Sequence, residues 1–275
     1  MTNFLAKKVY EVFGHSIKEG DLGIEVEVES NLKLPTQIPD SYWKVLNDGS
    51  LRGEAKEYVF SKPLAKEVAF AEVKNLYLYL DGKVNDSMRA GVHVHVNCQR
   101  LTVKQLFTVM AAYYCLENLL TEDAGEERQG NLFCLRLSDA DYVNTGIMGC
   151  LTHRDFLADG GIFSNENLRY GAMNLVSVSK FGSLEFRALR TPQTADKVIE
   201  WADLFLTLKE NTVKEFSSPV ELLNSMSANG GAEVVRKLLG AHAEKQISKP
   251  NFEESLYEGI RQIQHWVFLN NWETK

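Results

Sequence analysis

The chain has 275 residues, which is enough for one large domain or two small ones. Hydrophobic residues make up 44% and charged residues 24%, and no apolar run approaches the roughly 20 residues of a membrane-spanning helix, which excludes a membrane protein. The net charge of −7 argues against an extended footprint on nucleic acid.

The N-terminus and the cysteines bear on cellular location. Residues 1–13 include Lys7, Lys8 and Glu11, a pattern typical of a short amphipathic helix and not of a signal peptide. The four cysteines form no Cys-x-x-Cys pair, so we expect reduced, packed thiols. Together these features predict a cytoplasmic protein.

The N-terminal part of the chain combines predicted strands with two helices. Alternation and turn signals predict strands at residues 22–29, 42–45, 57–61 and 91–97, with Asp48 and Gly49 in the turn between the second and third. Helical spacing predicts helices at residues 64–80 and 102–120, the second capped by Thr102, and residues 121–131 read as a polar loop.

The remaining elements are mostly helical. Residues 150–157 predict a helix, and residues 173–178 and 183–189 predict two strands joined by a turn at Gly182. Helices are expected at residues 195–216, 220–239 and 253–268. The fold predicted is α+β, with one antiparallel sheet, flanking helices and a helical C-terminal tail. Residues 1–216 are assigned to the domain that carries the site, and residues 217–275 to a helical extension packed on it.

The first predicted strand carries an unusual row of acids. Because side chains alternate across a strand, Glu25, Glu27 and Glu29 share one face. Like charges about 7 Å apart along a strand repel, and burying them costs several kcal/mol unless cations lie among them. The pattern is typical either of a divalent-metal site or of a solvated acidic face.

Two other strands carry matching chemistry. His93 and His95 share one face of residues 91–97, and imidazole suits both divalent metals and phosphate. Glu185 and Arg187 share a face of residues 183–189, which suits a cation beside a phosphate that Arg grips bidentately. Glu57 could supply a further cation ligand. The alternatives are a polar edge-strand face and a cross-strand ion pair.

Several carboxylates, histidines and an arginine from different strands of one sheet indicate a single site. Mg²⁺ prefers oxygen ligands and substrate phosphates, so the combination points to nucleotide phosphate chemistry. The sequence contains no Walker loop, no Gly-x-Gly-x-x-Gly after a strand, no Gly-x-Ser-x-Gly elbow and no closed set of zinc ligands. P-loop, Rossmann, serine-hydrolase and zinc-site interpretations therefore lose support.

These segments, in this order, resemble the putative amidoligase family, whose members are carboxylate–amine ligases related to glutamine synthetase and glutamate–cysteine ligase. The matching segments are residues 23–27, 48–64, 91–96, 128–134 and 169–190. The resemblance extends over roughly residues 20 to 210. Ser183 stands where the family has Thr, and the helices after Phe216 are not explained by the resemblance.

The resemblance implies a sheet curved into a partial barrel like that of glutamine synthetase, with ATP and Mg²⁺ in a funnel. The metal ligands it implies are Glu25, Glu27, Glu57, His93 and Glu185. The nucleotide-binding residues it implies are His93, His95, Arg187 and Arg190, with Arg187 and Glu185 as catalytic residues. The substrate-binding residues it implies are Arg128, Arg169 and Asn174.

The activity implied by the resemblance is ATP-dependent, ADP-forming ligation of a small-molecule or peptide carboxylate to an amine through an acyl phosphate. One alternative is a catalytically reduced nucleotide- or metal-binding module on the same scaffold. Another is a phosphotransferase such as a guanidino kinase, whose phosphorylated product would persist. Apolar helix faces near Trp266 and Phe268 would suit a homo-oligomer. The sequence identifies neither the acid nor the amine.

Overall fold

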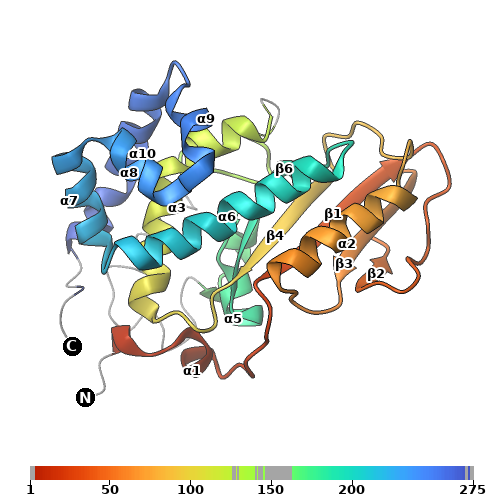
Figure 1. The fold of residues 1–275 in the computed structure, drawn as a ribbon, viewed down its shortest axis with the longest axis horizontal. Coiled ribbons are helices and arrows are strands. Elements are labelled where there is room, and N and C mark those ends of the chain that lie inside the picture. The colour runs from red at the N-terminus through yellow and green to blue at the C-terminus, as the bar shows by residue number, and fades with distance from the viewer. Residues whose placement is uncertain are drawn as a thin grey trace.

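The computed structural model describes residues 4–125, 128, 130–139, 141, 145, 163–269 and 272. Its strands form one six-stranded antiparallel sheet in the order β2-β3-β1-β4-β6-β5 (Figure 1). Because β2 and β5 are the outer strands, the sheet is open within these residues. The strands are β1 (Leu22–Ser30), β2 (Trp43–Leu46), β3 (Glu54–Phe60), β4 (Gly91–Asn97), β5 (Met173–Asn174) and β6 (Ser183–Arg190).

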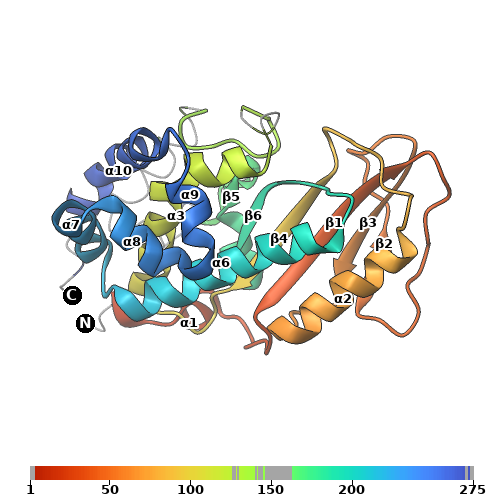
Figure 2. The ribbon, with the colours of Figure 1, turned by 45° about the horizontal axis from the view of Figure 1, so that its top comes forward.

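Two long helices cover one face of the sheet, and several others gather at one end of it (Figure 1, Figure 2). The described helices are α1 (Val9–Phe13), α2 (Lys66–Tyr79), α3 (Val103–Asp123), α5 (Val176–Phe181), α6 (Ala195–Glu215), α7 (Pro219–Asn229), α8 (Gly231–Leu239), α9 (Ala243–Ile247) and α10 (Phe252–Leu269). Figure 2 shows α2 and α6 along the same face, where α2 contacts β1 and α6 contacts β4. Helices α7 and α10 pack against α3. The predicted α+β class, with flanking helices and a helical C-terminal tail, is confirmed.

The central strands separate an apolar face from a polar face. The side chains of the apolar face are at most 1% exposed, and they are Ile24, Val26, Val28, Val92, Val94 and Val96. Each such burial is worth about 1.5–3 kcal/mol. A slip of one residue would exchange the two faces, so this burial fixes the register and directs the acids and histidines to the opposite face.

The register brings residues from distant parts of the sequence opposite one another. The opposed pairs are Glu25 with His93, Glu27 with Glu57, and His95 with Glu185. Adjacent strands lie about 4.8 Å apart. Four strands therefore contribute charged or ionisable groups to one continuous patch.

A bulge interrupts β6 beside this patch. Phe186 and Leu189 face successive valines of β4, so β6 has two residues between them where β4 has one. Without the bulge, alternation from Arg187 would put Arg190 on the apolar face. With it, Arg190 pairs with Gly91 and lies on the polar side.

The strand predicted at residues 173–178 is wrong beyond residue 174. The side-chain oxygen of Asn174 accepts the N–H of Val176 at 2.9 Å, and the hydroxyl of Ser177 donates to the carbonyl of Asn174 at 2.9 Å. These local bonds turn the chain into α5, which ends at Gly182 with a φ of +74°. A short apolar run does not distinguish a strand from a buried helix.

Most other elements lie within a few residues of their predicted bounds. Thr102 caps α3 by accepting the N–H of Gln105 at 3.1 Å, and α3 continues to Asp123, inside the predicted loop. The helix predicted at residues 220–239 is broken at Gly230, whose φ is +77°. The short N-terminal helix is split into 3-10 helix Phe4–Ala6 and α1. The helix predicted at residues 150–157 lies outside the described residues. Among the described helices, none combines the length and apolarity that crossing a bilayer requires.

Candidate active site

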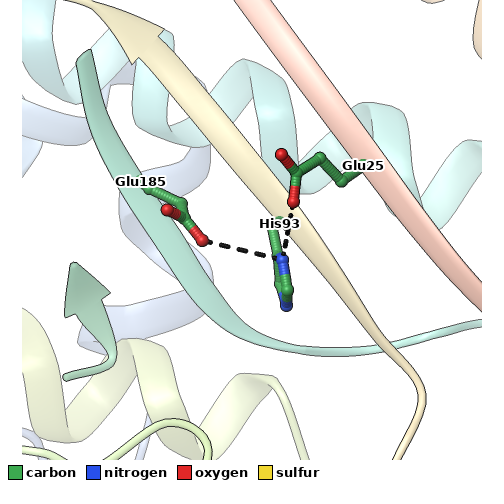
Figure 3. Close-up of side chains that lie close together, drawn as sticks. All are labelled: Glu25, His93 and Glu185. Atoms are coloured by element: carbon green, nitrogen blue, oxygen red, sulfur yellow. Dashed lines mark hydrogen bonds and ion pairs between the residues drawn. The ribbon is translucent and has the colours of Figure 1, made fainter. Parts of the chain in front are cut away.

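One acidic cluster lies across the three central strands. Figure 3 shows Glu25 of β1 and Glu185 of β6 pointing toward His93 of β4. His93 Nδ1 lies 3.0 Å from Glu25 Oε2 and 3.6 Å from Glu185 Oε1. One ligand atom from each residue lies within 4.8 Å of the others, which is close enough for all three to hold one cation. His95 adjoins the cluster, with Nε2 at 3.2 Å from Glu25 Oε1.

The charges in this cluster depend on one another. Burial disfavours the carboxylate of Glu25, but hydrogen bonds with His93 and His95 outweigh it and hold its pKa well below the ordinary value. Burial likewise opposes ionisation of Glu185, yet the charges of His95 and Arg187 lower its pKa. Both acids are therefore held as carboxylates, the form in which they can bind a cation.

Glu185 is fixed in place from two sides. Asn174 Nδ2 donates to its Oε2 at 2.6 Å, and Arg187 Nη1 donates to its Oε1 at 2.5 Å. The Glu185 side chain is only 6% exposed, so these bonds restrict it to one orientation. Asn174, implied by the resemblance as a substrate ligand, thus contacts a proposed metal ligand in the structure.

A second cluster lies beside the first on β1 and β3. It consists of Glu27, Glu57 and Asp48, whose ligand atoms also lie within 4.8 Å of one another. Asp48 comes from the β2–β3 turn, where its Oδ1 accepts the N–H of Ser50 at 2.7 Å. Three carboxylates without an imidazole suit a hard cation such as Mg²⁺, while the first cluster adds one nitrogen ligand. The donor sets therefore fit the divalent cations that the sequence predicts.

Repulsion within the second cluster is only partly relieved by neighbouring groups. Burial, followed by the charges of Glu25, Glu27 and Asp48, raises the pKa of Glu57 to about 7. Burial also raises the pKa of Glu27, although His93 and the N–H of Gly91 oppose the shift. A cation between these oxygens would remove the repulsion.

Replacing Glu57 with Gln should stabilise the metal-free protein at pH 8. The pKa of Glu57 is near 7 in the folded state and near 4.5 when unfolded, so the folded protein loses stability as the pH rises from 4.5 through 7. The amide carries no charge and avoids this loss. Thermal melting in EDTA should give a higher Tm for E57Q than for wild type at pH 8 and equal values near pH 4.

Added Mg²⁺ should reverse that order, raising the Tm of wild type more than that of E57Q. Glu210→Gln, on an exposed position of α6, serves as the charge-matched control and should leave both measurements unchanged. A lower Tm for E57Q than for wild type in EDTA at pH 8 would show that the charge of Glu57 does not destabilise the metal-free protein.

Two cavities adjoin the clusters. One of about 690 Å³ extends along His95, Lys62 and Phe181, and another of about 310 Å³ contains Arg187 and Arg169. Glu25 and Glu57 line both. The acidic clusters therefore separate two cavities of different size and lining.

The remaining predicted arginines divide into two groups. Arg169, which is exposed, and Arg187, whose side chain is 19% exposed, line the smaller cavity. Arg128 also reaches it but is buried, donating to the carbonyls of Ala188 at 2.7 Å, Arg187 at 3.2 Å and Met88 at 3.3 Å.

The guanidinium of Arg128 can reach the backbone carbonyls of β6 because residue 91 beside it is glycine. A Cβ at Gly91 would lie 3.0 Å from Arg128 Nη2. Arg190 lines neither cavity; its Nε donates to the carbonyl of Ser87 at 2.7 Å, and it pairs with Asp86. The guanidinium groups of Arg128 and Arg190 thus donate hydrogen bonds to backbone carbonyls.

Sequence reasoning missed several residues of the site. The sequence predicts Asp48 only as a turn residue, and it assigns no role to Arg89 or to Tyr170, although Tyr170 lies in a segment that matches the family; both line the smaller cavity. Glu29, on the same face as Glu25, contacts two neighbouring connections instead: its carboxylate accepts from the hydroxyl of Ser87 at 2.7 Å and from the N–H of Arg52 at 2.7 Å. Only the Asp48-Gly49 turn beside an acidic strand offered a signal in advance.

The described residues form an open antiparallel sheet of the α+β class, with two carboxylate clusters that could each hold a cation and that lie between two cavities. A family model described as putative amidoligase enzyme matches residues 4–208, which is most of the chain. The chain belongs to this family, as the motifs predict, and membership indicates a ligase that forms amide bonds. No curated protein matches the chain.

Proposed function

We propose that the protein is an ATP-dependent, ADP-forming ligase that joins a carboxylic acid to an amine through an acyl phosphate. The observation that carries the proposal is the pair of cavities that meet at the two carboxylate clusters. Phosphoryl transfer to an acid needs the attacking carboxylate oxygen and the ADP oxygen roughly in line on opposite sides of the γ-phosphorus, and one cavity on each side of the clusters allows that placement.

The larger cavity suits the nucleotide. Lys18, Lys62 and Lys180 line it, and they would balance a polyanion, while Phe60 and Phe181 offer aromatic surface to a base. His95 lies between this cavity and the first cluster. The smaller cavity, with its arginines, is then left for the acid.

The reaction has two steps. An oxygen of the substrate carboxylate attacks the γ-phosphorus, and the bond from that phosphorus to the ADP oxygen breaks, giving an acyl phosphate. The amine nitrogen then attacks the acyl carbon, the bond to the phosphate oxygen breaks, and the nitrogen loses a proton to give the amide. The products are ADP, phosphate and the amide.

Divalent cations bound to the two clusters would neutralise the phosphate charge and orient its oxygens. The residues of the chain act by position and charge. Arg187, adjacent to both clusters, can donate to the phosphoryl oxygens as negative charge is redistributed over them. Asn174 holds Glu185 in the orientation that leaves its other oxygen toward His93.

The described cysteines support a mechanism without a protein nucleophile. Cys98, Cys115 and Cys134 are buried, and burial raises the pKa of each thiol, that of Cys98 to about 11. None of the three is a reactive thiolate at neutral pH. The proposal therefore assigns catalysis to charge stabilisation and to the positioning of the two substrates.

The proposal is tested by incubating the full chain with ATP, Mg²⁺ and pooled carboxylic acids and amines. ADP should form only when acid, amine and Mg²⁺ are all present, and mass spectrometry should detect a product equal to acid plus amine minus one water. A stable product that has gained a phosphoryl group would contradict the ligase function and indicate a phosphotransferase. ATP binding without any product across the pools would favour a catalytically reduced binding module.

A further inference from the structure

Resting on the proposed ligase function, we propose that the acid substrate is a compact dianion. One carboxylate reacts beside the clusters, and a second anionic group, a carboxylate or a phosphate-type group, is bound by Arg89 and Arg169. Both arginines line the 310 Å³ cavity together with Glu27 and Glu57.

Arg89 lies on a surface segment, residues 86–90, whose backbone is fixed by several hydrogen bonds. The hydroxyl of Ser87 donates to Glu29 Oε2 at 2.7 Å and accepts the N–H of Arg89 at 3.0 Å and of Ala90 at 3.3 Å. Glu29, the third acid of β1, therefore fixes the turn that precedes β4. Because the N–H of Arg89 is bonded within this turn, the backbone direction at Arg89 is fixed as well.

Two further arginines hold the same segment. Arg190 Nε donates to the carbonyl of Ser87 at 2.7 Å, and its Nη2 pairs with Asp86 at 2.5 Å. Arg128 Nη1 donates to the carbonyl of Met88 at 3.3 Å. The bulge in β6 is what turns Arg190 toward this segment. Three ionic side chains thus fix residues 86–90, whose exposed Arg89 is the side chain that reaches the cavity.

Arg169 is held from another element. It lies in 3-10 helix Glu166–Tyr170, where Asn165 caps the first turn. Its guanidinium lies 4.7 Å from the centre of the Tyr170 ring and donates to the Tyr170 hydroxyl at 2.5 Å. Stacking on a ring leaves most of the guanidinium donors available to a ligand.

The charge balance of the cavity leaves these two cations for a ligand. Within the part of the chain that the structure describes, Arg187 is paired with Glu185 and Arg128 is committed to carbonyls, but neither Arg89 nor Arg169 forms an ion pair. The carboxylates of the same cavity belong to the clusters and would be neutralised by divalent cations. Two uncompensated guanidinium groups then remain, and a planar carboxylate or a phosphate fits their donors.

The size of the cavity favours a small acid. Its volume of 310 Å³ lies at the small end of the range of ligand sites, about 300–1,000 Å³. Phe133 and Tyr170 are the aromatic residues in its lining, which is otherwise polar or charged, so the cavity offers little to an apolar acid.

Calorimetric titration of the full chain in Mg²⁺ tests this assignment with three probes: glutarate, its monoamide, and 3-phosphonopropionate. Wild type should bind glutarate or the phosphonate at least about tenfold more tightly than the monoamide, because the monoamide lacks the second charge. The stronger of the two dianions identifies the tail as carboxylate or phosphate. In R89Q/R169Q the preference should fall to about twofold or less, while monoamide affinity is retained.

Ser87→Ala separates positioning from general structure, since it should weaken the dianions by severalfold and leave the monoamide unchanged. Arg236→Gln, an exposed arginine of α8 paired with Glu244, is the matched control and should keep the full preference. An equal preference in R89Q/R169Q and wild type, no preference in wild type, or no binding of any probe would overturn the inference.

The failure of this inference and that of the proposed function give different results. If ADP formation depends on a monoanionic acid with a KM that R89Q/R169Q leaves unchanged, the ligase stands and the dianion subsite fails. If the dianion preference depends on Arg89 and Arg169 but no acid and amine yield ADP and amide, the subsite stands and the ligase fails.

Discussion

Glu185→Gln should lower amide-forming turnover about a thousand-fold while the protein stays folded. The amide retains the shape of Glu185 and can still accept from Asn174, but it removes the charge that faces His93 at 3.6 Å and pairs with Arg187 at 2.5 Å. Loss of a single electrostatic contact at a transition state costs on the order of 10²–10³ in rate, and loss of a cation ligand adds to it. Initial rates of ADP formation measure the effect, with circular dichroism as the check of folding.

Glu210→Gln is again the control, because it removes one carboxylate from an exposed helix face and should keep turnover within about twofold of wild type. Turnover of E185Q within tenfold of wild type, in a folded protein, would remove Glu185 from the catalytic centre.

Arg187→Lys should lower kcat about a hundred-fold or more and change the KM for ATP far less. Lysine keeps the positive charge beside Glu185 but lacks the planar pair of donors that matches phosphoryl oxygens. It also loses the bond from Nε to the carbonyl of Phe133 at 3.4 Å. A contact made mainly in the transition state appears in kcat, whereas a ground-state contact appears in KM.

Arg190→Lys is the matched comparison, since the two arginines lie three residues apart on β6. Because Arg190 holds residues 86 and 87 and lines neither cavity, its substitution should leave kcat nearly unchanged and raise the KM for the acid. Equal losses of kcat in the two variants would contradict the distinct positions assigned to them.

The centre of the sheet could be predicted from the sequence because apolar and polar residues alternate along β1 and β4. Residues 91–97 repeat valine and polar residues over seven positions, long enough to fix both the element and its faces. Residues 173–178 could not be predicted in this way, because the side chain of Asn174 bonds to the backbone ahead of it and diverts the chain into α5. Propensity does not register such a bond between a side chain and the backbone.

The candidate site was accessible from sequence only in part. Glu25, His93 and Glu185 lie together because antiparallel neighbours β1, β4 and β6 share one polar face, a juxtaposition that three alternating patterns suggest. Asp48 joins the second cluster only because the β2–β3 turn brings it to Glu27, which sequence spacing does not disclose.

The arginines show the same limit. The sequence does not distinguish Arg128, Arg169 and Arg190 as anion ligands. In the folded chain, however, Arg128 and Arg190 donate to backbone carbonyls. A guanidinium has five donors and no preference between a carbonyl and a ligand until the surroundings are known. Arg89 belongs to no repeating pattern, so no sequence signal marked it.

The division of the site between strands and connections has an evolutionary consequence. The acids and the histidine of the two clusters lie mainly on paired strands, where every substitution must satisfy the register, whereas Arg89 and Arg169 lie on connecting segments with looser constraints. New acids could thus be recruited by mutating a few connecting positions, with the reactive centre left untouched. The same separability makes residues 86–90 and 166–170 the natural targets for redirecting such an enzyme to other acids.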